Sequence, residues 1–198
     1  MPVHYEKIFS DREEEQVRAR VRSALKTKGT VVALVFNFVD LMTHGRSESP
    51  VLMEVAKDEM ALRDLTKSWF ERSTLFSVLK EAAAQGHHVL FTTDHGSILC
   101  QRPTTVFARR DATSNLRYKF GSNLGCNEKE TFLIKVPSDY RLPSDGPSKQ
   151  YAIAKEDYYF VYPTEFHRYE RQYRGSFQHG GISLEEMILP CAVMLPRT

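Results

Sequence analysis

The chain has 198 residues, of which 41% are hydrophobic, and this size suffices for one substantial core in a single domain. A net charge of +2 gives no strong attraction for nucleic acid, and no apolar run approaches the ~20 residues of a membrane-spanning helix. Three widely spaced cysteines without a Cys-x-x-Cys pair argue against a disulfide scaffold and a thiolate zinc site. We therefore expect a cytoplasmic protein that does not contact membranes.

The first half of the chain alternates predicted helices with short apolar strands. A charged helix over about 11–28 precedes the apolar run 31–38, which is typical of a buried parallel strand. The segments that follow are a loop over 39–50, helices over 50–72 and 75–85, and a strand over 88–93. Helices between two such strands indicate an α/β fold with a doubly wound, mostly parallel sheet.

The second half is less regular. Residues 101–150 are rich in Arg, Asn, Ser, Gly and Pro, which predicts a loop-rich, irregular insertion with one or two short strands. A strand over 158–162, an aromatic-rich helix over 165–173 and a final strand over 188–195 are predicted beyond it. Pro190 interrupts the final strand, which suits an edge strand or the start of a strand.

Aspartate and histidine side chains gather where these elements end. Asp40 and His44 follow the first predicted strand, Asp94 and His95 follow the second, and His179 precedes a Gly-Gly pair. Ligands bind at the carboxyl ends of strands in open α/β sheets, and carboxylate and imidazole ligands suit Zn²⁺ or Mn²⁺. Five such ligands suit two ions better than one, and a pair ~3.5–4 Å apart forms a clamp for in-line displacement at phosphorus.

Each motif alone also has a plainer interpretation. Asp40 could cap a turn and leave His44 exposed, and Asp94-His95 followed by glycine makes a good turn. His179 could be a hydrogen-bonded loop residue. The occurrence of all three motifs in one chain favours a metal site over these alternatives.

The order and spacing of the motifs resemble the three C-terminal metal motifs of the alkaline phosphatase superfamily. The matching stretches are Asn37-Phe38-Val39-Asp40-x-x-x-His44, Thr92-Thr93-Asp94-His95-Gly96 and His179-Gly180-Gly181-Ile182-Ser183-Leu184-Glu185-Glu186. The last stretch is similar to PglZ domains, in particular to the output domain of PorX-type response regulators of the type IX secretion system. The resemblance covers about residues 30–196.

The resemblance implies two divalent metal ions, with zinc expected and manganese as the alternative. Asp40, His44 and His179 would bind one ion, and Asp94 and His95 would bind the other. The function implied is that of a phosphodiesterase or phosphatase, a metal-dependent hydrolase, in a two-component response regulator for secretion. The substrate would be a phosphoester, perhaps resembling a nucleotide.

The family's nucleophile, a threonine or serine at a helix start, has no match upstream of the first motif. Thr30 precedes its strand, and Ser10 is expected to cap the first helix. We therefore expect residues 1–198 to be the C-terminal part of one PglZ domain, opening with a charged helix within 1–29. Such a chain would lack the nucleophile half and be inactive by itself.

Other polar residues have two interpretations each. Arg117 and Lys119 could hold a substrate phosphate or belong to a solvated basic loop. Glu185 and Glu186 are expected to begin the last helical turn or to orient His179. The alternative function is a non-catalytic signalling module with structural or relict metal sites, which forms a homodimer or contacts a sigma factor or a secretion-system protein.

Overall fold

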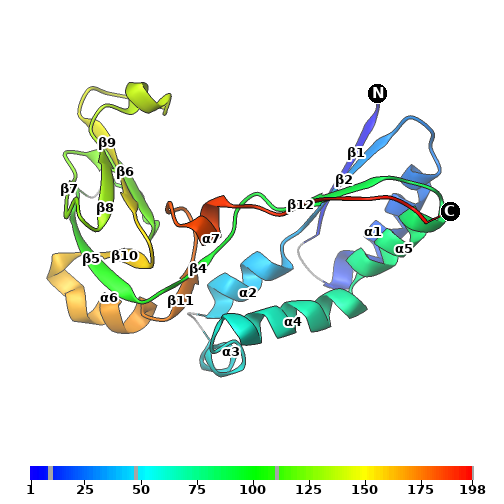
Figure 1. Ribbon diagram of the computed structural model, residues 1–198, viewed down its shortest axis with the longest axis horizontal. Helices are drawn as coiled ribbons and strands as arrows, with labels where there is room; N and C mark the ends of the chain where they lie inside the picture. The colour runs from blue at the N-terminus through cyan, green and yellow to red at the C-terminus, as the bar shows by residue number, and fades with distance from the viewer. Residues whose placement is uncertain (9–10, 47–48, 110–111, 198) are drawn as a thin grey trace. The chain divides into compact units, whose positions relative to one another are not determined.

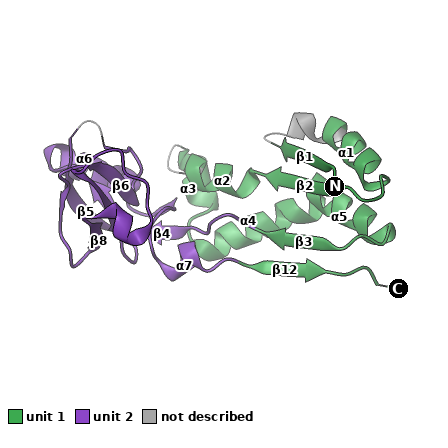
Figure 2. Cartoon of the chain, turned by 90° about the horizontal axis from the view of Figure 1, so that it is seen from above, with its two compact units in different colours: residues 1–45, 49–92, 190–198 green, residues 46–48, 93–189 purple. Residues whose placement is uncertain are grey.

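The computed structural model describes residues 1–8, 11–46, 49–109 and 112–197, without the side chains of residues 11–15 and 46. The chain forms two compact units (Figure 2). Unit 1 comprises residues 1–45, 49–92 and 190–198, and unit 2 comprises residues 46–48 and 93–189. Helices and small mixed sheets make up the described residues, as expected for an α/β protein.

Unit 1 alternates strands and helices (Figure 1). Its elements are β1 (Val3–Ile8), α1 (Asp11–Leu25), β2 (Val31–Phe36), α2 (Phe38–Arg46), α3 (Pro50–Val55), α4 (Glu59–Arg72), α5 (Thr74–Ala84), β3 (Val89–Thr92) and β12 (Cys191–Met194). β1 pairs with β2 in parallel, and β12 pairs with β3 antiparallel. The predicted helix over 50–72 is divided because Asp58 caps α4 by accepting a hydrogen bond from Ala61 N.

The core of unit 1 lies between the β1–β2 pair and two helices. Ile8 of β1 is buried together with Val17 and Val21 of α1 and Val78 of α5. Each such side chain contributes roughly 1.5–3 kcal/mol when it is fully buried. The strands place alternate residues on the other face, where the exposed apolar side chains are Val3, Tyr5, Val31 and Val35.

Two elements of unit 1 differ from the prediction. Residues 1–29 were expected to lead with a helix, but residues 3–8 form β1. Ser10, the expected cap of α1, lies outside the described residues. The predicted loop over 39–50 is mostly the helix α2, whose first residue, Phe38, stacks on Trp69 of α4 with ring centroids 4.2 Å apart. This aromatic contact anchors α2 to the helices that follow it.

Unit 2 consists mainly of short strands. Its elements are β4 (Ile98–Cys100), β5 (Arg102–Phe107), β6 (Tyr118–Ser122), β7 (Gly125–Cys126), β8 (Thr131–Ile134), β9 (Lys149–Ala154), β10 (Tyr158–Val161), α6 (Phe166–Tyr173), β11 (Ser176–Gln178), α7 (Leu184–Met187) and 3₁₀ turns at Pro137–Tyr140 and Pro163–Glu165. The strands pair in the orders β6-β9-β8, β10-β5-β7 and β11-β4. The stretch 101–150 therefore holds more strand than the irregular insertion that was predicted.

The doubly wound, mostly parallel sheet is not confirmed. Only β1–β2 and β5–β10 pair in parallel among the strands that the structure describes, and the other pairings are antiparallel. The predicted strand at 158–162 and helix at 165–173 are confirmed as β10 and α6. Within the described part of the chain, no helix is long and apolar enough to cross a membrane.

Candidate functional site

Asp40 and His44 lie four residues apart on α2 in unit 1. This spacing places them on the same side of the helix, and His44 Nε2 lies 3.3 Å from Asp40 Oδ1. Phe38, which anchors α2 to Trp69, lies about 200° around the helix from Asp40. The packing of α2 therefore turns the Asp40–His44 side away from that anchor.

His95 follows β3 and has a defined orientation in unit 2. Its Nδ1 lies 3.1 Å from the carbonyl oxygen of Gly96, and a carbonyl only accepts, so this contact assigns the ring proton to Nδ1. Nε2 then keeps its lone pair for a metal ion. The neighbouring carboxylate, Asp94 Oδ1, lies 3.8 Å from Nε2 and also accepts a hydrogen bond from His95 N at 3.1 Å.

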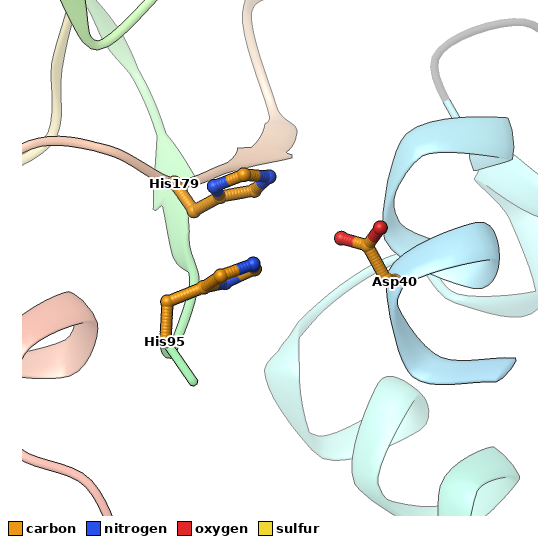
Figure 3. Close-up of side chains that lie close together, drawn as sticks. All are labelled: Asp40, His95 and His179. Carbon is orange, nitrogen blue, oxygen red and sulfur yellow. The ribbon is translucent and has the colours of Figure 1, made fainter. Parts of the chain in front are cut away.

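His179 joins His95 in unit 2. The antiparallel β11–β4 pairing sets Gln178 opposite Ile98, so the residue after β11 comes beside the residues before β4. The two imidazole rings stack with centroids 3.8 Å apart and planes inclined by 13° (Figure 3). One ring nitrogen of His95 lies within 4.8 Å of one ring nitrogen of His179. Asp40, the third side chain drawn in Figure 3, is carried by α2 of unit 1.

The donor atoms within each unit fit a divalent metal ion. Two ligands of a tetrahedral zinc ion, each 2.0–2.2 Å from it, are separated by about 3.4 Å. The separation of Asp40 and His44 is 3.3 Å, and that of Asp94 and His95 is 3.8 Å. Nitrogen and carboxylate oxygen are also the ligand types that zinc and manganese accept. The assignment of these residues to particular ions stays a prediction.

A buried ion pair lies beside the segment that follows His179. Arg117 is 0% exposed and Glu186 is 3% exposed, and the guanidinium donates to the carboxylate from Nε at 2.9 Å and from Nη2 at 2.6 Å. Burial by itself raises the pKa of the Glu186 carboxyl. Hydrogen bonds from Arg117, Gly181 N and Ser183 N outweigh that effect and hold the pKa below its ordinary value. The carboxylate is therefore held in its charged form.

The structure gives Arg117 and Lys119 surroundings that the sequence did not predict. Lys119 is 1% exposed and donates from Nζ to the carbonyl of Thr113 at 2.9 Å. Its burial lowers the pKa of the ammonium group to about 8. Both cations contact the protein's own groups, rather than forming a solvated basic loop. Phosphate binding by either residue stays a prediction.

Sequence reasoning missed the partnership of Arg117 with Glu186. The two residues are 69 positions apart in the sequence, and neither position has a pattern that indicates the other. Orientation of His179 by Glu186 was among the expectations, as was a final helical turn, which α7 confirms. The Ser-x-x-Glu spacing of Ser183 and Glu186 is a local signal that marks Glu186 as structurally engaged, and the Glu186 carboxylate does accept a hydrogen bond from Ser183 N.

Comparison with known protein families identifies one family that matches almost the whole chain. The family model of the BREX system PglZ alkaline phosphatase-like domain matches residues 1–194. No curated protein matches the chain. Alkaline phosphatase-like proteins generally use divalent metal ions, and the matched residues include all five predicted ligands.

Proposed function

Because the chain belongs to the PglZ family of alkaline phosphatase-like domains, we propose that it holds the divalent metal ions of a phosphoesterase. The observation that carries this proposal is the His95–His179 stack, in which two predicted ligands from separate motifs meet. The Nδ1 contact of His95 adds to it, since it leaves Nε2 of that ring available for an ion.

In this proposal Asp40, His44 and His179 hold one ion, while Asp94 and His95 hold the other. Zinc is the proposed metal because its common ligands are imidazole and carboxylate. Bound metal ions would supply Lewis-acid stabilisation of the phosphoryl oxygens. The protein's own residues assign the ring proton of His95 to Nδ1 and hold the Glu186 carboxylate in its charged form.

Inorganic phosphate is the probe for the phosphoester class, because product binding requires no nucleophile. We expect calorimetric titration to detect phosphate binding by the zinc-loaded chain, with loss of that binding in His179→Ala and in Asp40→Ala. His167→Ala is the matched control, since this exposed histidine contacts Glu170 on α6 instead. Phosphate binding that is equal with and without zinc would contradict the proposal.

Narrower features of the proposed function follow from the resemblance alone. They are a nucleotide-like phosphoester substrate, a place in a response regulator for type IX secretion, and contact with a sigma factor or secretion-system protein. Hydrolysis of phosphodiesters and phosphomonoesters, compared with and without a nucleoside group, would test the substrate class. Co-purification of a sigma factor or of secretion-system components with the protein would test the rest.

A second candidate function is a protein-interaction module. The face of β1–β2 opposite to α1 and α5 favours it, since Val3 is 65% and Tyr5 is 59% exposed there. In this case a substitution at Tyr5 would abolish signalling, while Asp40→Ala and His95→Ala would leave it unchanged. The opposite pattern in the same signalling assay would favour the phosphoesterase.

A further inference from the structure

Glu186 contacts both histidine-bearing segments of unit 2 at once. Its carboxylate accepts a hydrogen bond from Gly181 N at 2.8 Å, two residues after His179. Its backbone carbonyl accepts a hydrogen bond from Gly96 N at 3.1 Å, one residue after His95. A single residue of α7 therefore connects the backbone beside one imidazole to the backbone beside the other.

Arg117 fixes Glu186 in turn. Besides its two bonds to the carboxylate, the guanidinium donates to the carbonyl of Glu156 at 2.7 Å and to that of Tyr158. These carbonyls belong to β10 and to the turn before it, so the charged pair is tied to the sheet. A planar, five-donor group is suited to such a multi-sided contact, which an ammonium group cannot reproduce.

Two glycines permit the close approach that these contacts require. A Cβ atom at Gly96 would lie 1.9 Å from the backbone oxygen of Glu185, and one at Gly181 would lie 2.3 Å from Arg117 Nη2. Neither position has room for a side chain. The two histidine-bearing segments are therefore packed directly onto α7 and onto the buried guanidinium.

We propose that Arg117 and Glu186 are positioning residues, which hold His95 and His179 in register for joint use as ligands. This proposal rests on the proposed function for its metal-binding consequence, but the ring stacking itself can be measured without metal. The pair acts through the hydrogen-bonded backbone beside each histidine. Loss of the pair would loosen the two segments where they extend beyond the β11–β4 pairing.

The test compares Glu186→Gln and Arg117→Lys with the parent chain. NMR of the metal-free chain, with labelled histidine, detects contacts between the two rings and the proton on His95 Nδ1. Zinc titration then measures affinity. We expect both variants to lose the inter-ring contacts and to bind zinc about 10–100-fold more weakly, the range seen when groups that orient metal ligands are removed. Arg117→Lys is the milder change if Glu186→Gln fails to fold.

Two controls separate positioning from general destabilisation. Glu185→Gln changes an exposed neighbour of the same helix, and Val106→Ala weakens the core of unit 2 away from the histidines. Both should keep the inter-ring contacts and the zinc affinity. Intact ring contacts in Glu186→Gln and Arg117→Lys, or an equal loss in Val106→Ala, would overturn the proposal. A parent chain that stacks its rings but binds no zinc would instead contradict the proposed function and leave the positioning role supported.

Discussion

The buried pair of Arg117 and Glu186 should show strong energetic coupling in a double-mutant cycle. Arg117→Met leaves the carboxylate with the N–H groups of Gly181 and Ser183, but removes the donor for several backbone carbonyls. We expect it to lower the free energy of unfolding by about 4–5 kcal/mol, the upper part of the range for breaking a buried pair. Glu186→Gln leaves Arg117 charged and bound only to carbonyls, which costs about 3 kcal/mol.

The double variant decides the argument. It retains the unsatisfied carbonyls but contains no unpaired buried charge. Its free energy of unfolding should therefore be lowered by about as much as that of Arg117→Met alone. The coupling energy then equals the cost of Glu186→Gln alone, about 3 kcal/mol. The exposed pair of Arg63 and Glu59 on α4 is the control, with a side-chain exposure of 78% and 50% and an expected coupling of about 0.3–0.5 kcal/mol.

Denaturant unfolding followed by near-ultraviolet circular dichroism is the assay. All tyrosines except Tyr5 lie in unit 2, whereas the single tryptophan, Trp69, lies in unit 1. The tyrosine signal therefore reports on the unit that contains the pair. If the double variant loses the sum of the two single-variant losses in the free energy of unfolding, the reasoning is refuted, because the two charges then do not stabilise each other.

Two further predictions concern unit 2. Gly96→Ala should lower the melting temperature strongly, because its Cβ would meet backbone at 1.9 Å. Gly146→Ala should change the melting temperature little, because its Cβ would meet only a Lys149 side-chain atom at 3.9 Å. Equal melting temperatures for the two variants would contradict this prediction. Burial lowers the pKa of Lys119 from 10.5 to about 8. Between these pH values the unfolded chain binds more protons than the folded chain, so the contribution of this group to stability rises as the pH increases. The free energy of unfolding of the parent minus that of Lys119→Met should rise from pH 8 to 10.5, and a flat difference would show that the ammonium is not desolvated.

Hydrophobic patterning predicted the elements that have one apolar face or are continuously apolar. β2 and β3 were found as apolar runs that each follow a helix, and α6 was found from its aromatic content. α2 was missed because it is only nine residues long and mixes apolar side chains with polar ones, and its first residue, Phe38, stacks on Trp69. That contact joins positions 31 residues apart, which local propensity cannot reveal.

The strand content of unit 2 was underestimated because polar residues can lie on the buried face of a strand there, where apolar residues are normally expected. In β6 the alternation of Tyr118, Lys119 and Phe120 would normally place the lysine in solvent, but the structure buries it. Arg117, the residue before this strand, is also fully buried. Such burial depends on partners distant in the sequence, which a local pattern does not reveal. By contrast, the aspartate and histidine residues at the ends of elements could be recognised as candidate metal ligands from the sequence alone.

Zinc stoichiometry tests the central claim most directly. The chain and its variants would be loaded with zinc, dialysed extensively against metal-free buffer and analysed by mass spectrometry of the metal. We predict that the parent and the control His167→Ala retain zinc, and that His179→Ala and Asp40→Ala each lose the ion proposed for Asp40, His44 and His179. A parent chain without zinc, or variants that retain as much zinc as the parent, would contradict the account.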